Sequence, residues 1–113
     1  MSEKARYAQH DSAMKLPLAL VPTELEKEVA RVMQFGAQKY GRDDWRLGFP
    51  WMELLNSCQR HINNFLEGRD RDHESGCSHI AHAATNLGFL LYCMRYFPEL
   101  DDRPKPPKRG DNG

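Results

Sequence analysis

Three candidate metal-binding histidines and four carboxylates gather in one short stretch of the chain, which also contains His73. The stretch spans residues 60 to 86 and reads RHINNFLEGRDRDHESGCSHIAHAATN. Neutral imidazole together with carboxylate is an ordinary ligand set for a divalent metal ion. Charged groups and buried histidines need partners inside a protein, so this gathering favours a functional polar site. The residues concerned are His61, His79, His82, Glu67, Asp70, Asp72 and Glu74.

The spacing of the histidines predicts which of them lie together. His79, His82 and Asn86 are separated by three and four residues, which places them on one face of a helix. Glu74 comes just before that expected helix, where the helix dipole favours an anion. His61 falls in register with the apolar residues of the preceding helix and should point inward. A single inward histidine is more often a core residue, but three on adjacent helices beside a carboxylate indicate metal binding.

Basic and aromatic residues elsewhere in the chain would suit a nucleotide. Lys39 and Tyr40 end the first expected helix, Arg60 lies within the second, and Lys15 lies in an amino-terminal arm. Trp45, with arginines on both sides, and Tyr40 offer flat faces on which a base can stack. Each has an ordinary explanation, since a lysine complements a helix end and a loop tryptophan fills a core. Together with the metal cluster they indicate a nucleotide site, where a divalent ion neutralises phosphate or activates water.

Helical periodicity predicts that an all-α bundle of three long helices positions these residues. Thr23 and Glu26 have the spacing of a capping box, and Pro98 stops the last helix. We expect a single domain over residues 1–98, with an extended arm at 1–22 and a flexible Pro-rich tail at 99–113. The expected helices run from Thr23 to Tyr40, from Pro50 to about Gly68, and from about Ser75 to Tyr96.

Composition narrows the class of protein. The 113 residues carry sixteen basic and sixteen acidic side chains, without the basic excess of a nucleic-acid or membrane-surface binder. Three cysteines and the lack of an apolar signal segment predict a cytoplasmic protein. Residues 75–94 have no charged side chain, yet their polar groups favour a central bundle helix over a membrane span. One subunit can hardly cover so apolar a helix, so we expect a homo-oligomer, a dimer or tetramer.

Three other interpretations of these residues are weaker. Cys77 with His79 and His82 suggests zinc, but the spacing matches no familiar structural zinc pattern. The pair His10-Asp11 is typical of HD-type phosphohydrolases, whose further ligands the chain does not obviously supply, so we interpret it as surface. A non-catalytic helical module that binds metal or nucleotide and acts through a partner also fits the pattern.

Three segments resemble the phage-encoded dATP/dGTP diphosphohydrolase family, which is related to the MazG-like nucleotide pyrophosphohydrolases. The segments are DSAMKLPLALVP, ARVMQFGAQKYGRDDW and the stretch of residues 60–86, and the likeness covers about residues 11–97. The resemblance implies an all-α fold and a metal-bound deoxynucleoside triphosphate. It also implies a reaction that releases pyrophosphate and leaves a nucleoside monophosphate. In a phage this reaction would contribute to modified-base DNA synthesis or to control of the host nucleotide pool.

The resemblance carries over to residues of this chain. MazG-like enzymes hold Mg²⁺ through E-x-x-E and E-x-x-D motifs, but here E-x-x-E is absent, and the E-x-x-D between the second and third expected helices is Glu67 to Asp70. His79 and His82 stand where the second motif would be, and imidazole shifts the preference from Mg²⁺ toward Mn²⁺, Co²⁺ or Zn²⁺. Glu74 is the expected ligand or catalytic base. The expected metal ligands are His61, Asp72, Glu74, His79 and His82, and the expected substrate contacts are Lys15, Lys39, Tyr40, Trp45, Arg60 and Asn86.

Overall fold

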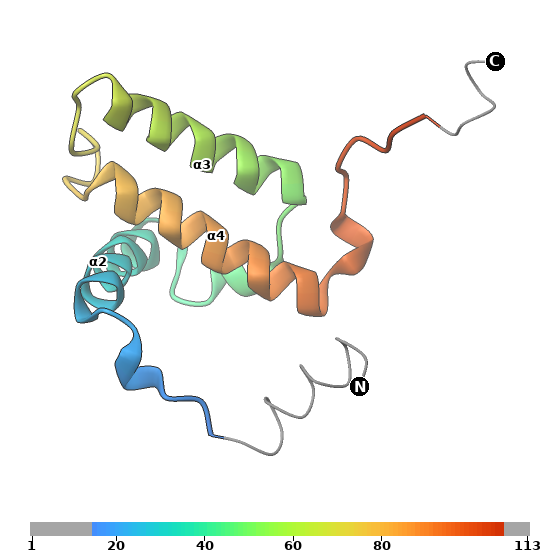
Figure 1. The fold of residues 1–113 in the computed structure, drawn as a ribbon, viewed down its shortest axis with the longest axis horizontal. Helices are drawn as coiled ribbons and strands as arrows, with labels where there is room; N and C mark the ends of the chain where they lie inside the picture. The colour runs from blue at the N-terminus through green and yellow to red at the C-terminus, as the bar shows by residue number, and fades with distance from the viewer. Residues whose placement is uncertain (1–14, 108–113) are drawn as a thin grey trace.

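The computed structural model describes residues 15–107 and builds them from three α-helices. Helices α3 and α4 lie side by side, and α2 crosses beside α4 (Figure 1). Within residues 15–107 there is no strand, only an isolated bridge between Arg71 and Ser78. This confirms the all-α class, while the pair His10-Asp11 lies outside the described residues. The helices are α2 (Thr23–Tyr40), α3 (Trp51–Leu66) and α4 (His79–Tyr96), with 3₁₀ turns η1 (Leu18–Leu20), η2 (Asp44–Leu47) and η3 (Pro98–Leu100).

Helix α2 has the predicted bounds, but its amino-terminal cap differs from the prediction. Pro22 occupies the N-cap position, and no side chain closes the first turn. A capping box needs its threonine outside the first turn, whereas Thr23 is already helical, so the predicted pair with Glu26 is wrong. Gly41 ends the helix as expected, with φ of 110° and its N–H bonded to the carbonyl oxygen of Ala37 at 3.0 Å.

Helix α4 begins at His79 and not at the predicted Ser75. Ser78 is its N-cap, and its Oγ accepts the N–H of Ile80 at 3.1 Å. The residues before it form a loop instead, between the end of α3 and the start of α4. Glu74 therefore does not stand at the amino terminus of α4, and the predicted dipole interaction with that helix is wrong.

Two apolar clusters hold the helices together. The larger lies between α3 and α4, where Cys93 is fully buried against Trp51 and Leu54. The smaller joins α2 to the start of α4 through Val32, Cys77 and Ala81. Burial of these groups supplies the free energy that fixes α4 between its two neighbours. Partly buried side chains around the larger cluster are Phe49, Phe89, Leu90, Phe97 and Leu100.

The described part of the amino-terminal arm, residues 15–22, leaves large apolar side chains exposed. Leu16, Leu18 and Leu20 are 52%, 68% and 80% exposed, although the sequence led us to expect that they would cover the body. Figure 1 shows residues 15–22 leading away from the helices. The described residues 15–107 therefore leave much of the apolar surface of these three leucines uncovered.

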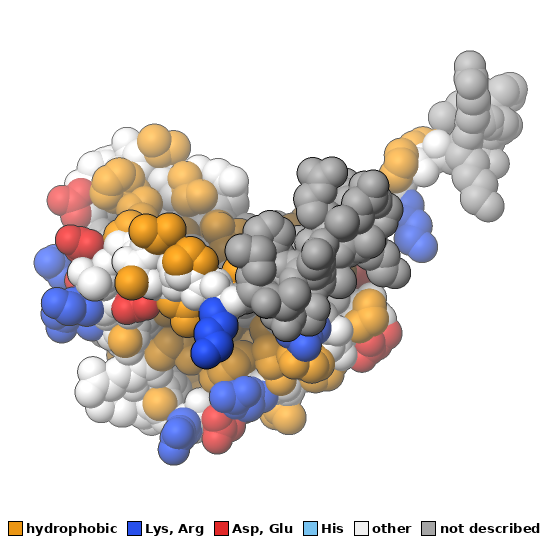
Figure 2. Space-filling model, turned by 60° about the horizontal axis from the view of Figure 1, so that its bottom comes forward, with side chains coloured by type: hydrophobic (Ala, Val, Ile, Leu, Met, Phe, Trp, Pro, Cys, Tyr) orange, Lys and Arg blue, Asp and Glu red, His pale blue; other side chains and the backbone are white. Residues whose placement is uncertain are grey.

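Helix α4 also leaves an apolar stripe uncovered. Ile80, Leu87, Leu91 and Met94 are 45%, 45%, 68% and 52% exposed, and their spacing follows one face of the helix. Figure 2 shows hydrophobic side chains exposed among basic ones on one face of the molecule. Among the described helices, none combines the length and the apolar character that crossing a membrane requires.

The segment after α4 folds back onto the start of α3. Oδ1 of Asp102 accepts the N–H of Met52 at 2.8 Å, and the guanidinium of Arg103 lies 4.9 Å from the ring centre of Trp51. Indole Nε1 of Trp51 donates to the carbonyl oxygen of Phe97 at 3.2 Å. Residues 102 and 103 thus contact α3, although they follow residue 98, the predicted end of the domain. The division into a domain at 1–98 and a tail at 99–113 remains a prediction.

Asp102→Ala should lower the free energy of unfolding by about 1 kcal/mol, the usual cost of losing a helix cap. The N–H of Met52 belongs to the first turn of α3 and has no partner within the helix, so Asp102 satisfies an otherwise free donor. Urea unfolding followed by circular dichroism measures the change. Glu99→Ala is the matched control, because Glu99 is exposed and caps no helix. Equal midpoints for the two variants would show that Asp102 is not a cap.

Candidate metal and nucleotide site

The loop between α3 and α4 is folded around Asp72. Its Oδ2 accepts the N–H groups of Ser75 at 2.8 Å and Glu74 at 3.1 Å. The N–H of Asp72 donates to the carbonyl oxygen of Cys77 at 2.8 Å, and Gly76 makes the turn with φ of 73°. This arrangement fixes the carboxylate and leaves its second oxygen free of these bonds.

Asp72 is held in its ionised form. Burial alone would raise its pKa, but the hydrogen bonds from Ser75 and the nearby ring of His82 outweigh burial and keep the pKa below its ordinary value. A carboxylate that stays charged is ready to bind a cation.

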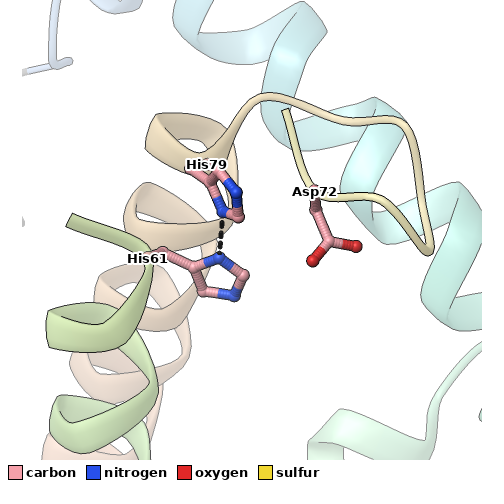
Figure 3. Close-up of side chains that lie close together, drawn as sticks. All are labelled: His61, Asp72 and His79. Atoms are coloured by element: carbon pink, nitrogen blue, oxygen red, sulfur yellow. Dashed lines mark hydrogen bonds between the residues drawn. The ribbon is translucent and has the colours of Figure 1, made fainter. Parts of the chain in front are cut away.

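Asp72 faces two histidines from different helices. His61 comes from α3 and His79 from the first turn of α4, and their Nδ1 atoms are 2.8 Å apart (Figure 3). One of these nitrogens donates a proton to the other, so the tautomers of the two rings are coupled. One possible ligand atom from each of His61, Asp72 and His79 lies within 4.8 Å of the other two. The loop and the two helix ends thus bring a ligand set together.

These three residues fit a divalent metal ion. An octahedral ion with bonds of about 2.1 Å has neighbouring ligand atoms about 3 Å apart, close to the 2.8 Å between the two Nδ1 atoms. The set of two imidazoles and one carboxylate suits Mn²⁺, Co²⁺ or Zn²⁺ better than Mg²⁺. Without an ion, the hydrogen bond between the rings satisfies the same nitrogens.

His82 and Glu74 lie beside this group of three and not within it. The ring of His82 stacks on that of His61, with centroids 4.5 Å apart and planes 7° from parallel. Its Nε2 is 2.6 Å from Oγ of Ser75, which ties α4 to the loop. The carboxylate of Glu74 forms an ion pair with Lys39 of α2. In this arrangement His82 supports the ring of His61. Glu74 pairs with the ammonium group of Lys39, to which a phosphate could also bind.

The surroundings of His61 and His82 favour their neutral forms. Burial, and after it the neighbouring His82 and His79, lower the pKa of His61. Burial also lowers the pKa of His82, against the opposite effect of Asp72. Neutral imidazole is the form that binds a metal ion, so both shifts favour ligation at neutral pH.

We expect the metal-free protein to lose thermal stability as the pH falls from 7.5 to 5.5. An unfolded histidine titrates near pH 6.5, whereas folded His61 and His82 have lowered pKa values, so the unfolded chain binds more protons below that pH. The pKa of Asp72 is also lowered, so its contribution is lost only at still lower pH. Melting curves across this range measure the effect. His61→Gln should flatten the dependence and the control His73→Gln should not; an unchanged slope in His61→Gln would contradict this explanation.

A cleft of about 470 Å³ opens beside the group. It lies between α2, α3, α4 and the η2 turn, and His61, Asp72, His82 and Glu74 line one part of it. Five of the six residues that we expected to contact substrate also line it, and Lys15 does not. Those five are Lys39, Tyr40, Trp45, Arg60 and Asn86.

The two expected stacking residues differ in how free they are. Trp45 already packs nearly parallel to Phe89, at 5.4 Å between centroids, and Arg46 lies 4.5 Å from its ring centre. Tyr40 is 63% exposed, with the ammonium of Lys39 5.1 Å from its ring centre. Trp45 therefore serves mainly as a wall of the cleft, and Tyr40 has more free surface for a ligand.

The cleft is also lined by polar residues that were not expected from the sequence, among them Glu53 and Ser57. Oγ of Ser57 accepts the side-chain amide of Asn86 at 3.0 Å, which links α3 to α4 across the cleft. Glu53, Ser57 and His61 are spaced four residues apart on α3. That spacing places them on the helix face of His61, a signal that could have found both residues.

Comparison with known proteins assigns the family. Residues 5–103 match the sequence profile of a family described as dATP/dGTP diphosphohydrolase, N-terminal. The chain belongs to this family. This confirms the resemblance that the three sequence segments indicated.

A protein of Salmonella phage PMBT28 named dATP/dGTP diphosphohydrolase is 40% identical over 89 residues, which cover 79% of this chain. This chain spans only 30% of the length of that relative. No solved structure matches the chain. The family assignment therefore depends on the sequence comparisons alone. The arrangement of the candidate site residues is known from the structure described above.

Proposed function

We propose that this domain hydrolyses deoxynucleoside triphosphates, dATP or dGTP, to the monophosphate and pyrophosphate with the help of a divalent metal ion. The observation that carries the proposal is the position of the group His61, Asp72 and His79 beside a cleft with cationic and aromatic walls. The name of the 40% identical phage protein supports the same reaction and substrates. A triphosphate needs a cation near its phosphates and a flat surface for its base, and the cleft offers both.

His61, Asp72 and His79 are the residues that would hold the metal, with His82 fixing the ring of His61. A divalent ion bound there supplies positive charge to phosphate oxygens and makes water a better nucleophile. We propose Mn²⁺ as the working ion, since the imidazole ligands suit it better than Mg²⁺, the other candidate, with Co²⁺ or Zn²⁺ as substitutes that these ligands also suit.

Lys39, Arg42 and Arg60 line the cleft and can neutralise the triphosphate. Lys39 is paired with Glu74 in the free protein. A phosphate that binds Lys39 competes for that pairing and releases the carboxylate of Glu74. The freed Glu74 can then take the proton of the attacking water, as a general base does. The water oxygen bonds to the α- or β-phosphorus, the bond from that phosphorus to the oxygen bridging the two breaks, and pyrophosphate and monophosphate separate.

Product analysis tests this proposal. Purified protein is incubated with each of the four dNTPs and Mn²⁺, and products are separated by ³¹P NMR. The proposal predicts pyrophosphate and monophosphate in equal amounts from a purine dNTP. Diphosphate and orthophosphate would show a different reaction. Binding without any product would favour the non-catalytic module.

We also propose that the protein works as a homo-oligomer, a dimer or tetramer, with the stripe of Ile80, Leu87, Leu91 and Met94 at the interface. The stripe carries no charge, and antiparallel copies of α4 can place it against itself. Light scattering should give a multiple of the 13.1 kDa chain mass, and Leu91→Glu should reduce it to one chain. Leu66→Glu, at another exposed leucine, should not. A monomer mass for the wild type would overturn the proposal.

A further inference from the structure

The cleft has two chemically different ends, and α3 runs from one to the other. Glu53 stands in the first turn of α3 and His61 two turns further on, with Ser57 between them. At about 1.5 Å per residue, Glu53 and His61 are about 12 Å apart along the helix axis. His61 marks the metal end, so Glu53 marks the opposite end.

The residues of α4 that line the cleft follow the same order, from the metal end to the opposite end. His82, Asn86 and Phe89 all line the cleft and follow one face of α4. His82 stacks on His61, Asn86 bonds to Ser57, and Phe89 packs against Phe49, at 5.7 Å between centroids. The far end of the cleft is therefore aromatic, with Trp45, Phe49 and Phe89 as its walls.

A nucleotide bound with its phosphates at the metal end has its base at this aromatic end. The aromatic walls supply apolar surface for any base and do not distinguish one base from another. Discrimination needs polar groups that match the hydrogen-bonding edge of the base. Glu53 offers a carboxylate at this end, and no described residue forms an ion pair with it.

We infer that Glu53 reads the base and that it selects guanine over adenine; this inference rests on the proposed function. An ionised carboxylate only accepts hydrogen bonds. Guanine presents two neighbouring donors, N1–H and the N2 amino group, which a carboxylate can accept together. Adenine presents an acceptor at N1 beside its N6 amino group, so one carboxylate oxygen would face a lone pair.

Glu53 has one ordinary alternative role. An acidic side chain in the first turn of a helix complements the helix dipole, and Glu24 likewise lies in the first turn of α2. Glu24 does not line the cleft, so Glu24→Gln is the matched control for that role. Asp44 lines the same cleft from the η2 turn, and Asp44→Asn is the control for the general loss of a negative charge there.

The test compares kcat/KM for dGTP, dITP and dATP in the wild type and in Glu53→Gln. The wild type should prefer dGTP to dATP by at least about tenfold, the discrimination expected of one bidentate contact. dITP lacks the N2 amino group and should fall between the two. Glutamine can donate to adenine N1 and accept from N6, so Glu53→Gln should lower the dGTP:dATP ratio by about tenfold or more. Both controls should keep the wild-type ratio.

An unchanged ratio in Glu53→Gln, a wild-type preference for dATP, or equal use of dGTP and dITP would overturn the inference. If no dNTP is hydrolysed, the proposed function fails, and calorimetric titration with dGMP and dAMP still decides about Glu53. Tighter binding of dGMP that Glu53→Gln abolishes would support base reading by Glu53. Equal binding of the two monophosphates, or no binding, would overturn it.

Discussion

Asp72→Asn should lower dNTP turnover by more than about a hundredfold while the fold survives. The amide oxygen of asparagine can still accept the N–H groups of Glu74 and Ser75, so the loop keeps its turn. The variant loses the negative charge that would bind the metal beside His61 and His79. Changing even an outer partner of a metal ligand typically costs ten- to a hundredfold in affinity or activity, and losing a ligand should cost more. Steady-state rates beside melting curves measure both effects.

Two histidine variants complete this experiment. His73→Gln changes an exposed histidine of the same loop that lies outside the metal group and should keep full activity. His82→Ala removes the ring that stacks on His61 and should raise the Mn²⁺ concentration needed for half-maximal rate by about ten- to a hundredfold. Wild-type rates in Asp72→Asn would place the metal elsewhere.

Lys39→Met should lower kcat/KM by about a hundredfold to a thousandfold, the usual cost of losing one preorganised charge partner. Its ammonium lines the cleft and pairs with Glu74, so it stands where a phosphate would bind. A lysine that only complemented the end of α2 would affect stability and leave turnover alone. Rates and melting temperatures measured on the same preparations separate the two roles.

Lys27→Met is the matched control, because Lys27 is an exposed lysine of the same helix outside the cleft. It should keep the wild-type kcat/KM. If Lys39→Met lowers stability and spares turnover, the phosphates bind elsewhere in the cleft, and the proposed release of Glu74 does not occur.

Much of the fold could be predicted from local rules. The bounds of α2 follow from its apolar periodicity and from Gly41, whose positive φ ends the helix. The end of α4 follows from Pro98. The start of α4 could not be predicted in the same way, since Ser75 is as compatible with a first turn as with a loop. A local hydrogen bond decides it, because the carboxylate of Asp72, three residues earlier, holds the backbone of Ser75 in a turn.

The candidate site shows the same limit. The spacing along α4 predicts that His79 and His82 share a face. It does not predict that His79 contacts His61 through Nδ1, or that the ring of His82 stacks on that of His61. The contact between Lys39 and Glu74 joins residues 35 positions apart, which no local pattern encodes. The spacing of Glu53 from His61 places both on one face of α3, but it does not show that this face borders a cleft, which the packing of α3 on α4 forms.

Turnover by metal-stripped protein tests the metal-dependent mechanism most directly. The protein is freed of metal with a chelator, given dGTP or dATP, and then titrated with Mn²⁺ while pyrophosphate and monophosphate are measured. We predict no product before Mn²⁺ is added, equal amounts of both products afterwards, and no recovery in Asp72→Asn at the same Mn²⁺ concentrations. Undiminished hydrolysis by the stripped protein, or full recovery in Asp72→Asn, would contradict a metal centre at His61, Asp72 and His79.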